Sequence, residues 1–273
     1  MLQDEQNRQP RKAYRVRHPL KIRTLTVSSI EKLGPNMLRF VFQSQDLSDF
    51  NSASFDDHVK VFFPNAQTGK LVLPEVTEQG ITFPTDEKPI MRDYTPRSFD
   101  QHRLTIDFAL HEAGPATDWA RHAKVGDTIG IGGPRGSMVI PMDFDGYLLI
   151  GDDTALPAIG RRLEELPAHV QVVVIAEVDS MQDQLEWQTQ ADIEVIWLQR
   201  MGQPAGQADL FLQALKHAPL PTGDFHTWIA AETNVARQIR KTLTQDFGVN
   251  KAYIKAAGYW QLGKIDTHEV LED

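Results

Sequence analysis

The hydrophobic pattern of the chain changes its period once, near residue 146, and this change limits the fold more than any other feature. Before it, short runs rich in β-branched and aromatic residues are separated by Gly, Pro, Asp and Asn. After it, short continuous apolar runs alternate with stretches of helical spacing. The first pattern predicts an antiparallel β-barrel. The second predicts a parallel sheet with helices on both faces.

The two patterns predict three segments. We expect a basic N-terminal arm over residues 1–20, a β-barrel domain over 21–145 and an α/β domain over 146–273 that ends in a C-terminal tail. One helix is expected within the barrel domain, opened by Pro115, because proline suits a first helical turn. Such a pair of domains often holds a flavin beside a second redox partner, but architecture alone is an analogy.

Composition excludes several classes of site. The 273 residues include no cysteine, which rules out disulfides, thiolate zinc sites and cysteine-ligated iron–sulfur clusters within the chain. The nine histidines are scattered without an i, i+4 pair, so no metal site is expected. No apolar run approaches the ~20 residues of a membrane span. The N-terminus lacks the apolar core of a secretory signal, so a cytoplasmic location is expected.

The net charge of −9 is unevenly distributed. Seven cations against two acids give residues 1–23 a charge of +5, which leaves 21 cations and 35 anions, a charge of −14, for the rest. So acidic a body is a poor nucleic-acid binder, and an anionic ligand would need a local basic pocket. The arm itself is expected to be solvated and to lead into the first strand.

The stretch "RDYTPR", residues 92–97, has two readings. It is either a polar hairpin with a type I turn at its proline or a grip on a phosphorylated, planar ligand. Arg92 and Tyr94 fall on one side of a strand. A guanidinium binds phosphate through a planar fork of donors, while the phenol can lie along a flat ring and the Thr95 hydroxyl can reach a ring nitrogen or carbonyl. The ligand reading therefore predicts a clamp for a flavin dinucleotide.

A second segment, "DFALHEAGPATDWA", supports the ligand reading. Gly114 and Pro115 open the expected helix there. Free backbone N–H groups at a helix start, together with the Thr117 hydroxyl, form an anion site. Two phosphate grips from separate segments suit a pyrophosphate.

Five motifs in order resemble the siderophore-interacting protein family: "RDYTPR", "DFALHEAGPATDWA", "GPRG", "GDDTALPAIGRRLEELP" and "GYWQLGK". The similarity runs from about Val16 to Lys264. This family comprises flavin-dependent ferric-siderophore reductases related to the ferredoxin–NADP reductases. The resemblance implies FAD held by the following residues: Arg92, Tyr94, Thr95, Asp107, Ala109, His111, Ala116 and Thr117. Taken alone, His111 also reads as a strand-end histidine with its partners satisfied and Trp119 as a core residue, whereas the resemblance makes both cofactor neighbours, Trp119 less so.

The resemblance also implies where the substrate binds. A ferric tricatecholate or hydroxamate is bulky and often anionic, which favours nearby cations. Basic residues at the positions of Lys60 and Arg135 line the family's siderophore pocket, and Lys264 is a third candidate. Lys60 also reads as an ordinary strand lysine that buries its aliphatic stem. Trp260 or Tyr259 either covers the flavin where a nicotinamide would stack or packs at the domain seam.

The electron donor follows from the turn "GDDTALPA" after the first parallel strand. Asp152 and Asp153 stand where the phosphates of a nicotinamide dinucleotide would lie, with Thr154 and the helix start as the remaining binding groups. We expect these carboxylates to face the pocket in part. The second parallel strand is followed by Glu177 and Asp179 with no nearby Lys or Arg, so NADH is favoured over NADPH. A ferredoxin or flavodoxin docked on the basic arm is a third possible donor.

The preferred function is FAD-dependent reduction of ferric siderophores by a monomer. Reduction of Fe(III) to Fe(II) would release the metal in the cytoplasm, because iron(II) binds hard oxygen donors less well. The cofactor carries the chemistry, so no side chain is assigned a catalytic role. Two alternatives remain open: a non-catalytic siderophore-binding flavoprotein and a general NAD(P)H flavin reductase.

Overall fold

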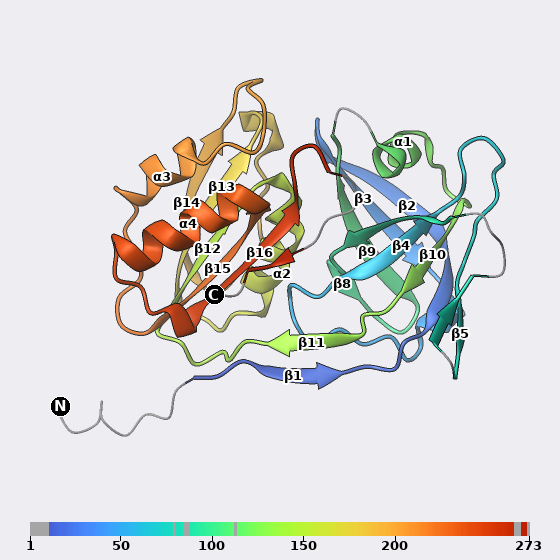
Figure 1. Cartoon of the computed structure of the whole chain (residues 1–273), viewed down its shortest axis with the longest axis horizontal. Coiled ribbons are helices and arrows are strands. Elements are labelled where there is room, and N and C mark those ends of the chain that lie inside the picture. The colour runs from blue at the N-terminus through green and yellow to red at the C-terminus, as the bar shows by residue number, and fades with distance from the viewer. Residues whose placement is uncertain (1–10, 79, 84–87, 112–113, 265–268, 272–273) are drawn as a thin grey trace.

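The computed structural model describes residues 11–78, 80–83, 88–111, 114–264 and 269–271 as a β-barrel domain beside an α/β domain (Figure 1). The predicted fold class is confirmed by the two main sheets, one antiparallel and one largely parallel. Within the part of the chain that the structure describes, none of the helices combines the length and apolarity needed to cross a lipid bilayer.

The first domain is built on a seven-stranded antiparallel sheet in the order β7-β4-β10-β2-β3-β9-β8. Its inner face buries a cluster of phenylalanine, valine, leucine and isoleucine side chains. Helix α1 (Pro115–His122) contacts β4, β7 and β9 and so covers one end of the barrel. The strands are β2 (Ile22–Gly34), β3 (Met37–Gln43), β4 (Val59–Phe63), β7 (Ile90–Tyr94), β8 (Ser98–Phe99), β9 (Arg103–Ala109) and β10 (Thr128–Gly132), with a separate hairpin of β5 (Glu75–Thr77) and β6 (Gly80–Thr82) and a 3₁₀ turn η2 (Gln45–Leu47).

The second domain is a six-stranded sheet in the order β14-β13-β12-β15-β16-β17. Its first five strands are parallel, and β17 pairs antiparallel with β16. The elements are β12 (Gly146–Gly151), η3 (Asp153–Ala155), α2 (Leu156–Glu165), β13 (Gln171–Val178), η4 (Met181–Asp183), β14 (Asp192–Gln199), α3 (Asp209–Leu215), β15 (Phe225–Glu232), α4 (Thr233–Gln245), η5 (Lys251–Tyr253), β16 (Ile254–Trp260) and β17 (Glu269–Val270).

The alternation of side chains along the buried strand β12 determines which helices cover which face. Tyr147 and Leu149 pack in the cluster that contains α2, while Leu148 and Ile150 pack in the cluster that contains α3 and α4. The α2 cluster also includes Phe55 from the barrel domain. Helix α2 therefore lies on the face of the sheet that meets the barrel.

From residue 11 onward, the basic N-terminal segment pairs with the rest of the chain as a strand, while most of its residues are exposed. Strand β1 (Tyr14–Arg17) pairs with β11 (Gly136–Val139). Arg11 donates to the Asp224 carbonyl (3.1 Å) and to Asp145 (3.3 Å), and its guanidinium lies over the Phe144 ring. A docking role for the arm stays a prediction. Residues 1–10 lie outside the described residues.

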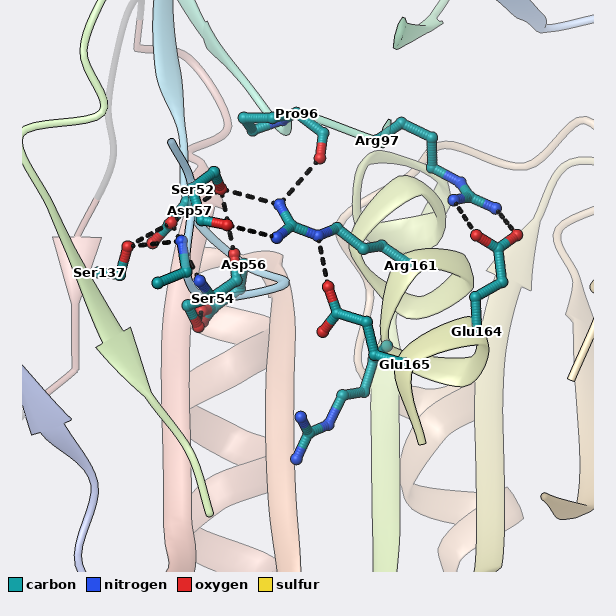
Figure 2. A network of polar contacts seen from close by, with 12 residues as sticks. Ser52, Ser54, Asp56, Asp57, Pro96, Arg97, Ser137, Arg161, Glu164 and Glu165 are labelled. Carbon is teal, nitrogen blue, oxygen red and sulfur yellow. Dashed lines mark hydrogen bonds and ion pairs between the residues drawn. The ribbon is translucent and has the colours of Figure 1, made fainter. Parts of the chain in front are cut away.

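Arg161 of α2 joins the two domains, as Figure 2 shows. The guanidinium donates to the Ser52 hydroxyl (2.8 Å), the Ser52 carbonyl (2.9 Å) and the Pro96 carbonyl (3.0 Å), and to Glu165 on its own helix (2.7 Å). The side chain is 8% exposed. A buried cation is tolerated when its donors are satisfied in this way.

We predict that Arg161→Ala lowers the free energy of unfolding by about 2–4 kcal/mol, because it leaves buried carbonyl groups of the barrel unpaired. Urea denaturation followed by tryptophan fluorescence measures this loss. Arg103→Ala is the matched control, since Arg103 pairs with Asp100 at the surface and its side chain is 67% exposed. Equal losses for the two variants would contradict a special role for Arg161.

Candidate functional site

Strand β7 presents Arg92 and Tyr94 on one face, as predicted. They stand opposite Val61 and Val59 of β4, whose side chains belong to the barrel core. The Tyr94 ring packs on Phe108 with 4.3 Å between ring centroids, and burial raises the pKa of its phenol. Arg92 Nη1 donates to the Met91 carbonyl (2.6 Å), which holds the guanidinium close to the strand. A guanidinium and an aromatic ring thus lie on one face of β7, as the predicted phosphate clamp requires.

The start of α1 is suited to hold an anion. Its N-cap is Gly114, which makes no side-chain capping hydrogen bond, and Pro115 follows at the first helical position. The hydroxyl oxygen of Thr117 accepts from the His111 N–H (3.3 Å), which links the first turn of the helix to the end of the preceding segment. Helix α1 contacts β7, the strand that carries Arg92, as a shared site would require. The donor set fits a pyrophosphate beside a flat ring.

Asp107, Ala109 and Thr95 lie at the domain seam. Asp107 is bound bidentately by Arg39 at 2.7 and 2.8 Å. Ala109 packs against the core of the α/β domain, and β9 contacts η3. The buried Thr95 hydroxyl hydrogen-bonds with Tyr259. Since the Asp107 and Thr95 side chains already have protein partners, contact between these residues and FAD stays a prediction.

Trp119 is partly buried and packs against the barrel core, and its place beside the cofactor stays a prediction. Its ring lies 5.3 Å from Phe40, 5.4 Å from Phe63 and 5.8 Å from Phe108, measured between ring centroids. Ala116 packs in the same barrel core, so only its backbone can serve the anion site.

The two aromatic candidates of β16 have different surroundings. Tyr259 packs edge to face on the buried Trp228 at 6.0 Å, so it belongs to the seam. Trp260 lies 6.5 Å from the ring of His111, which joins the end of β16 to the predicted cofactor segment. Of the two, Trp260 stays the prediction for the ring that covers the flavin.

In the turn after β12, the side chain of Asp152 points into the fold rather than into a pocket. Asp152 is buried and caps η3, accepting from the Thr154 N–H (3.0 Å) and hydroxyl (2.5 Å). It also accepts from the Glu232 N–H (3.0 Å) and from Trp260 Nε1 (2.8 Å). The expectation that this carboxylate faces the pocket is therefore wrong, because its oxygens are used within the fold. The Thr154 hydroxyl proton is used in the same cap.

NADH was preferred because no cation was expected near Glu177. Arg200, directly after β14, is such a cation. It contacts Asp153 and Glu177, each at 3.1 Å, because the parallel register brings the end of β14 beside the end of β13. Arg200 is distant from Glu177 in sequence, so the sequence analysis missed it. A signal was present, because "WLQR" ends a parallel strand and the carboxyl ends of parallel strands share one edge of the sheet. Burial, and then Asp152, raises the pKa of Glu177 to about 7. Burial, and then Asp153, raises the pKa of Asp152 to about 6.

The predicted substrate cations have unequal surroundings. Lys60 donates to Asp93 at 2.9 and 3.1 Å, a pair across β4 and β7 that the sequence pattern did not reveal. Lys60 also stands opposite Gly132, and the exposed Arg135 follows three residues later. Lys264 is exposed in the turn after β16. Arg135 is thus the more accessible cation of the pair near the ends of β4 and β10.

Comparison with known proteins identifies both domains. Residues 26–138 match the family model described as siderophore-interacting FAD-binding domain, and residues 144–263 match the siderophore-interacting protein model. The NADPH-dependent ferric-chelate reductase of Escherichia coli is 35% identical over 261 residues, which cover 93% of this chain and 98% of that protein. The ferric vibriobactin reductase ViuB of Vibrio cholerae is 31% identical over 237 residues, covering 85% and 86%. A crystal structure of a siderophore utilization protein from T. fusca superposes with a TM-score of 0.88 at 36% identity, covering 94% of this chain and 98% of that one.

We predict that Arg92→Ala weakens FAD binding roughly tenfold or more, because it removes a charge-assisted phosphate contact of ~1.5–3 kcal/mol. Titration of the apoprotein with FAD, followed by flavin fluorescence, gives the dissociation constant. Arg103→Ala again serves as the control. An unchanged dissociation constant for Arg92→Ala would contradict the phosphate clamp.

A second prediction concerns pH. The folded-state pKa of Glu177, about 7, lies above its ordinary value of 4.5, so the folded state holds this proton more tightly than the unfolded state. The resulting stabilisation is full below pH 4.5 and is lost as the pH rises through about 7. Glu177→Gln should therefore flatten the fall in unfolding free energy between these pH values by about 1–3 kcal/mol. Glu194→Gln, on the exposed face of β14, should leave the profile unchanged.

Proposed function

The chain belongs to the siderophore-interacting protein family, and from this premise we propose that it reduces ferric siderophores with bound FAD and with NADPH as the electron source. It is an FAD-dependent oxidoreductase of that family. The observation that carries the proposal is the match to an NADPH-dependent ferric-chelate reductase over 98% of that relative, together with the Arg92 and Tyr94 strand beside an uncapped helix start.

Each part of the site has a role in this proposal. Arg92 and the start of α1 would bind the pyrophosphate, and Tyr94 would flank the ring. Bound there, FAD supplies the redox chemistry, which takes electrons from a nicotinamide and delivers them singly to ferric iron. The iron complex is the substrate, and its reduced form is released because iron(II) binds hard oxygen donors less well. Activity as a monomer in the cytoplasm is part of the same proposal.

An anaerobic assay tests the reaction directly. The holoprotein is mixed with NADPH, a ferric siderophore and an iron(II) trap, and the absorbance of the ferric complex is followed. Loss of this absorbance supports the reductase. Binding without reduction would support a flavoprotein carrier, and reduction of free flavin alone would support a general flavin reductase. Turnover only when reduced ferredoxin or flavodoxin replaces NADPH would move the donor assignment to those proteins.

Charge should govern which siderophore binds well. We predict that the Lys60→Ala, Arg135→Ala double variant binds an anionic ferric tricatecholate about fivefold to tenfold more weakly, with flavin content unchanged. The loss should shrink as salt rises, because screening already weakens the attraction in the unmodified protein. Arg135→Ala alone should account for most of the effect, since Lys60 is paired with Asp93. An equal loss for a neutral ferric trihydroxamate would show that charge is not the cause.

A further inference from the structure

One buried carboxylate links three separate elements at the carboxyl edge of the parallel sheet. Asp152 Oδ1 accepts two hydrogen bonds from Thr154, within the turn after β12. Its Oδ2 accepts one from the Glu232 N–H, where β15 passes into α4, and one from Trp260 Nε1, at the end of β16. The side chain has four acceptor positions, so these four donors use its full capacity.

Trp260 is held through its backbone as well as through its indole ring. Its backbone carbonyl accepts from Thr233 Oγ1 (3.0 Å). A Cβ built on Gly206 would lie 3.2 Å from Trp260 Cη2, so a larger residue at position 206 would press on the ring. The ring lies between the turn after β12 and His111 of the predicted cofactor segment.

We propose that Asp152 is a positioning residue for Trp260: its carboxylate holds the indole over the turn after β12, so that a nicotinamide must displace the ring before it reaches the flavin. The link between Asp152 and Trp260 is a property of the fold alone. Its effect on nicotinamide access rests on the proposed function.

Protonation should release this link, since a neutral carboxyl group cannot accept from all four donors. Asp153 lies beside Asp152 in the turn, Glu177 of β13 interacts with it electrostatically, and the backbone N–H of Glu232 contacts it from β15. Arg200, directly after β14, pairs with Asp153 and Glu177. Burial and the neighbouring Asp153 raise the pKa of Asp152 to about 6. Trp228 provides an internal control: its Nε1 donates to Asp56 (2.9 Å), whose pKa Lys255 keeps below its ordinary value.

Indole N–H resonances of the five tryptophans in the FAD-loaded and FAD-free protein test the link without an activity assay. Trp260→Phe and Trp228→Phe assign the two signals. We expect the Trp260 signal to shift with a midpoint near pH 6 while the Trp228 signal stays constant. Asp152→Asn should remove the titration and speed solvent exchange of the Trp260 N–H. A Trp260 signal that is the same in Asp152→Asn and the unmodified protein would overturn the proposal.

Rapid mixing of the holoprotein with NADPH tests the consequence. Trp260→Phe keeps the aromatic ring and the Asp152 charge but lacks the N–H, so the NADPH concentration for half-maximal flavin reduction should fall about tenfold, the effect of one hydrogen bond to a charge. Asp152→Asn also removes a negative charge, and its effect should be largely absent when Trp260 is already Phe. Full additivity of the two changes would show that Asp152 does not act through Trp260.

The two experiments distinguish failure of the proposed function from failure of the link between Asp152 and Trp260. If NADPH does not reduce the flavin in the unmodified protein, the proposed function is wrong while the indole titration still reports on the link. If Asp152→Asn does not fold, Trp260→Phe removes the same hydrogen bond from its other end. An unchanged NADPH dependence in a folded Trp260→Phe protein would overturn the role in access.

Discussion

The guanidinium of Arg161 is the contact on which the two-domain site depends. It reaches from α2 to the barrel and binds the carbonyl of Pro96, the residue directly after Thr95 (Figure 2). A buried cation of this kind is favourable only while all of its partners are present, so it resists displacement of either domain. The hydrogen bonds of Arg161 therefore fix how the strand that carries Arg92 lies relative to the parallel sheet. Apolar packing of Phe55 in the α2 cluster supports this arrangement.

Three further contacts align the seam around this guanidinium. Arg97 pairs with Glu164 of α2, Lys255 of β16 with the buried Asp56, and Thr95 with Tyr259. Each joins a residue of the barrel to one of the α/β domain. As a result, β9 lies against η3, and His111 at the end of the cofactor segment meets Trp260 at the carboxyl edge of the sheet. The candidate site exists only because the two domains are held in this arrangement.

The pKa of the acid at the seam, Asp56, and the pKa of the acid at the sheet edge, Asp152, shift in opposite directions because their partners differ. The ammonium of Lys255 lies 2.6 Å from Asp56, whose side chain is 6% exposed, and it lowers the pKa of Asp56 against the opposing effect of burial. Asp152 receives hydrogen bonds but no direct cation, and Asp153 and Glu177 lie nearby, so its pKa is raised. Arg200 forms ion pairs with both Asp153 and Glu177. The sheet edge can therefore change its protonation close to neutral pH, whereas Asp56 at the seam stays ionised.

The sequence by itself determined the fold class, because hydrophobic periods of two and of about 3.6 residues are local properties, and it located Arg92, Tyr94 and the start of α1, because their spacing lies within single elements. Tertiary structure alone decided which charges meet. Lys60 meets Asp93, Arg11 meets Asp145 and Arg200 meets Glu177 across 33, 134 and 23 residues of sequence. It also decided that Trp119 faces the barrel core and that Asp152 turns inward. Strand order, register and side-chain direction make these pairings, and they depend on packing of the whole chain rather than on the residues beside each group.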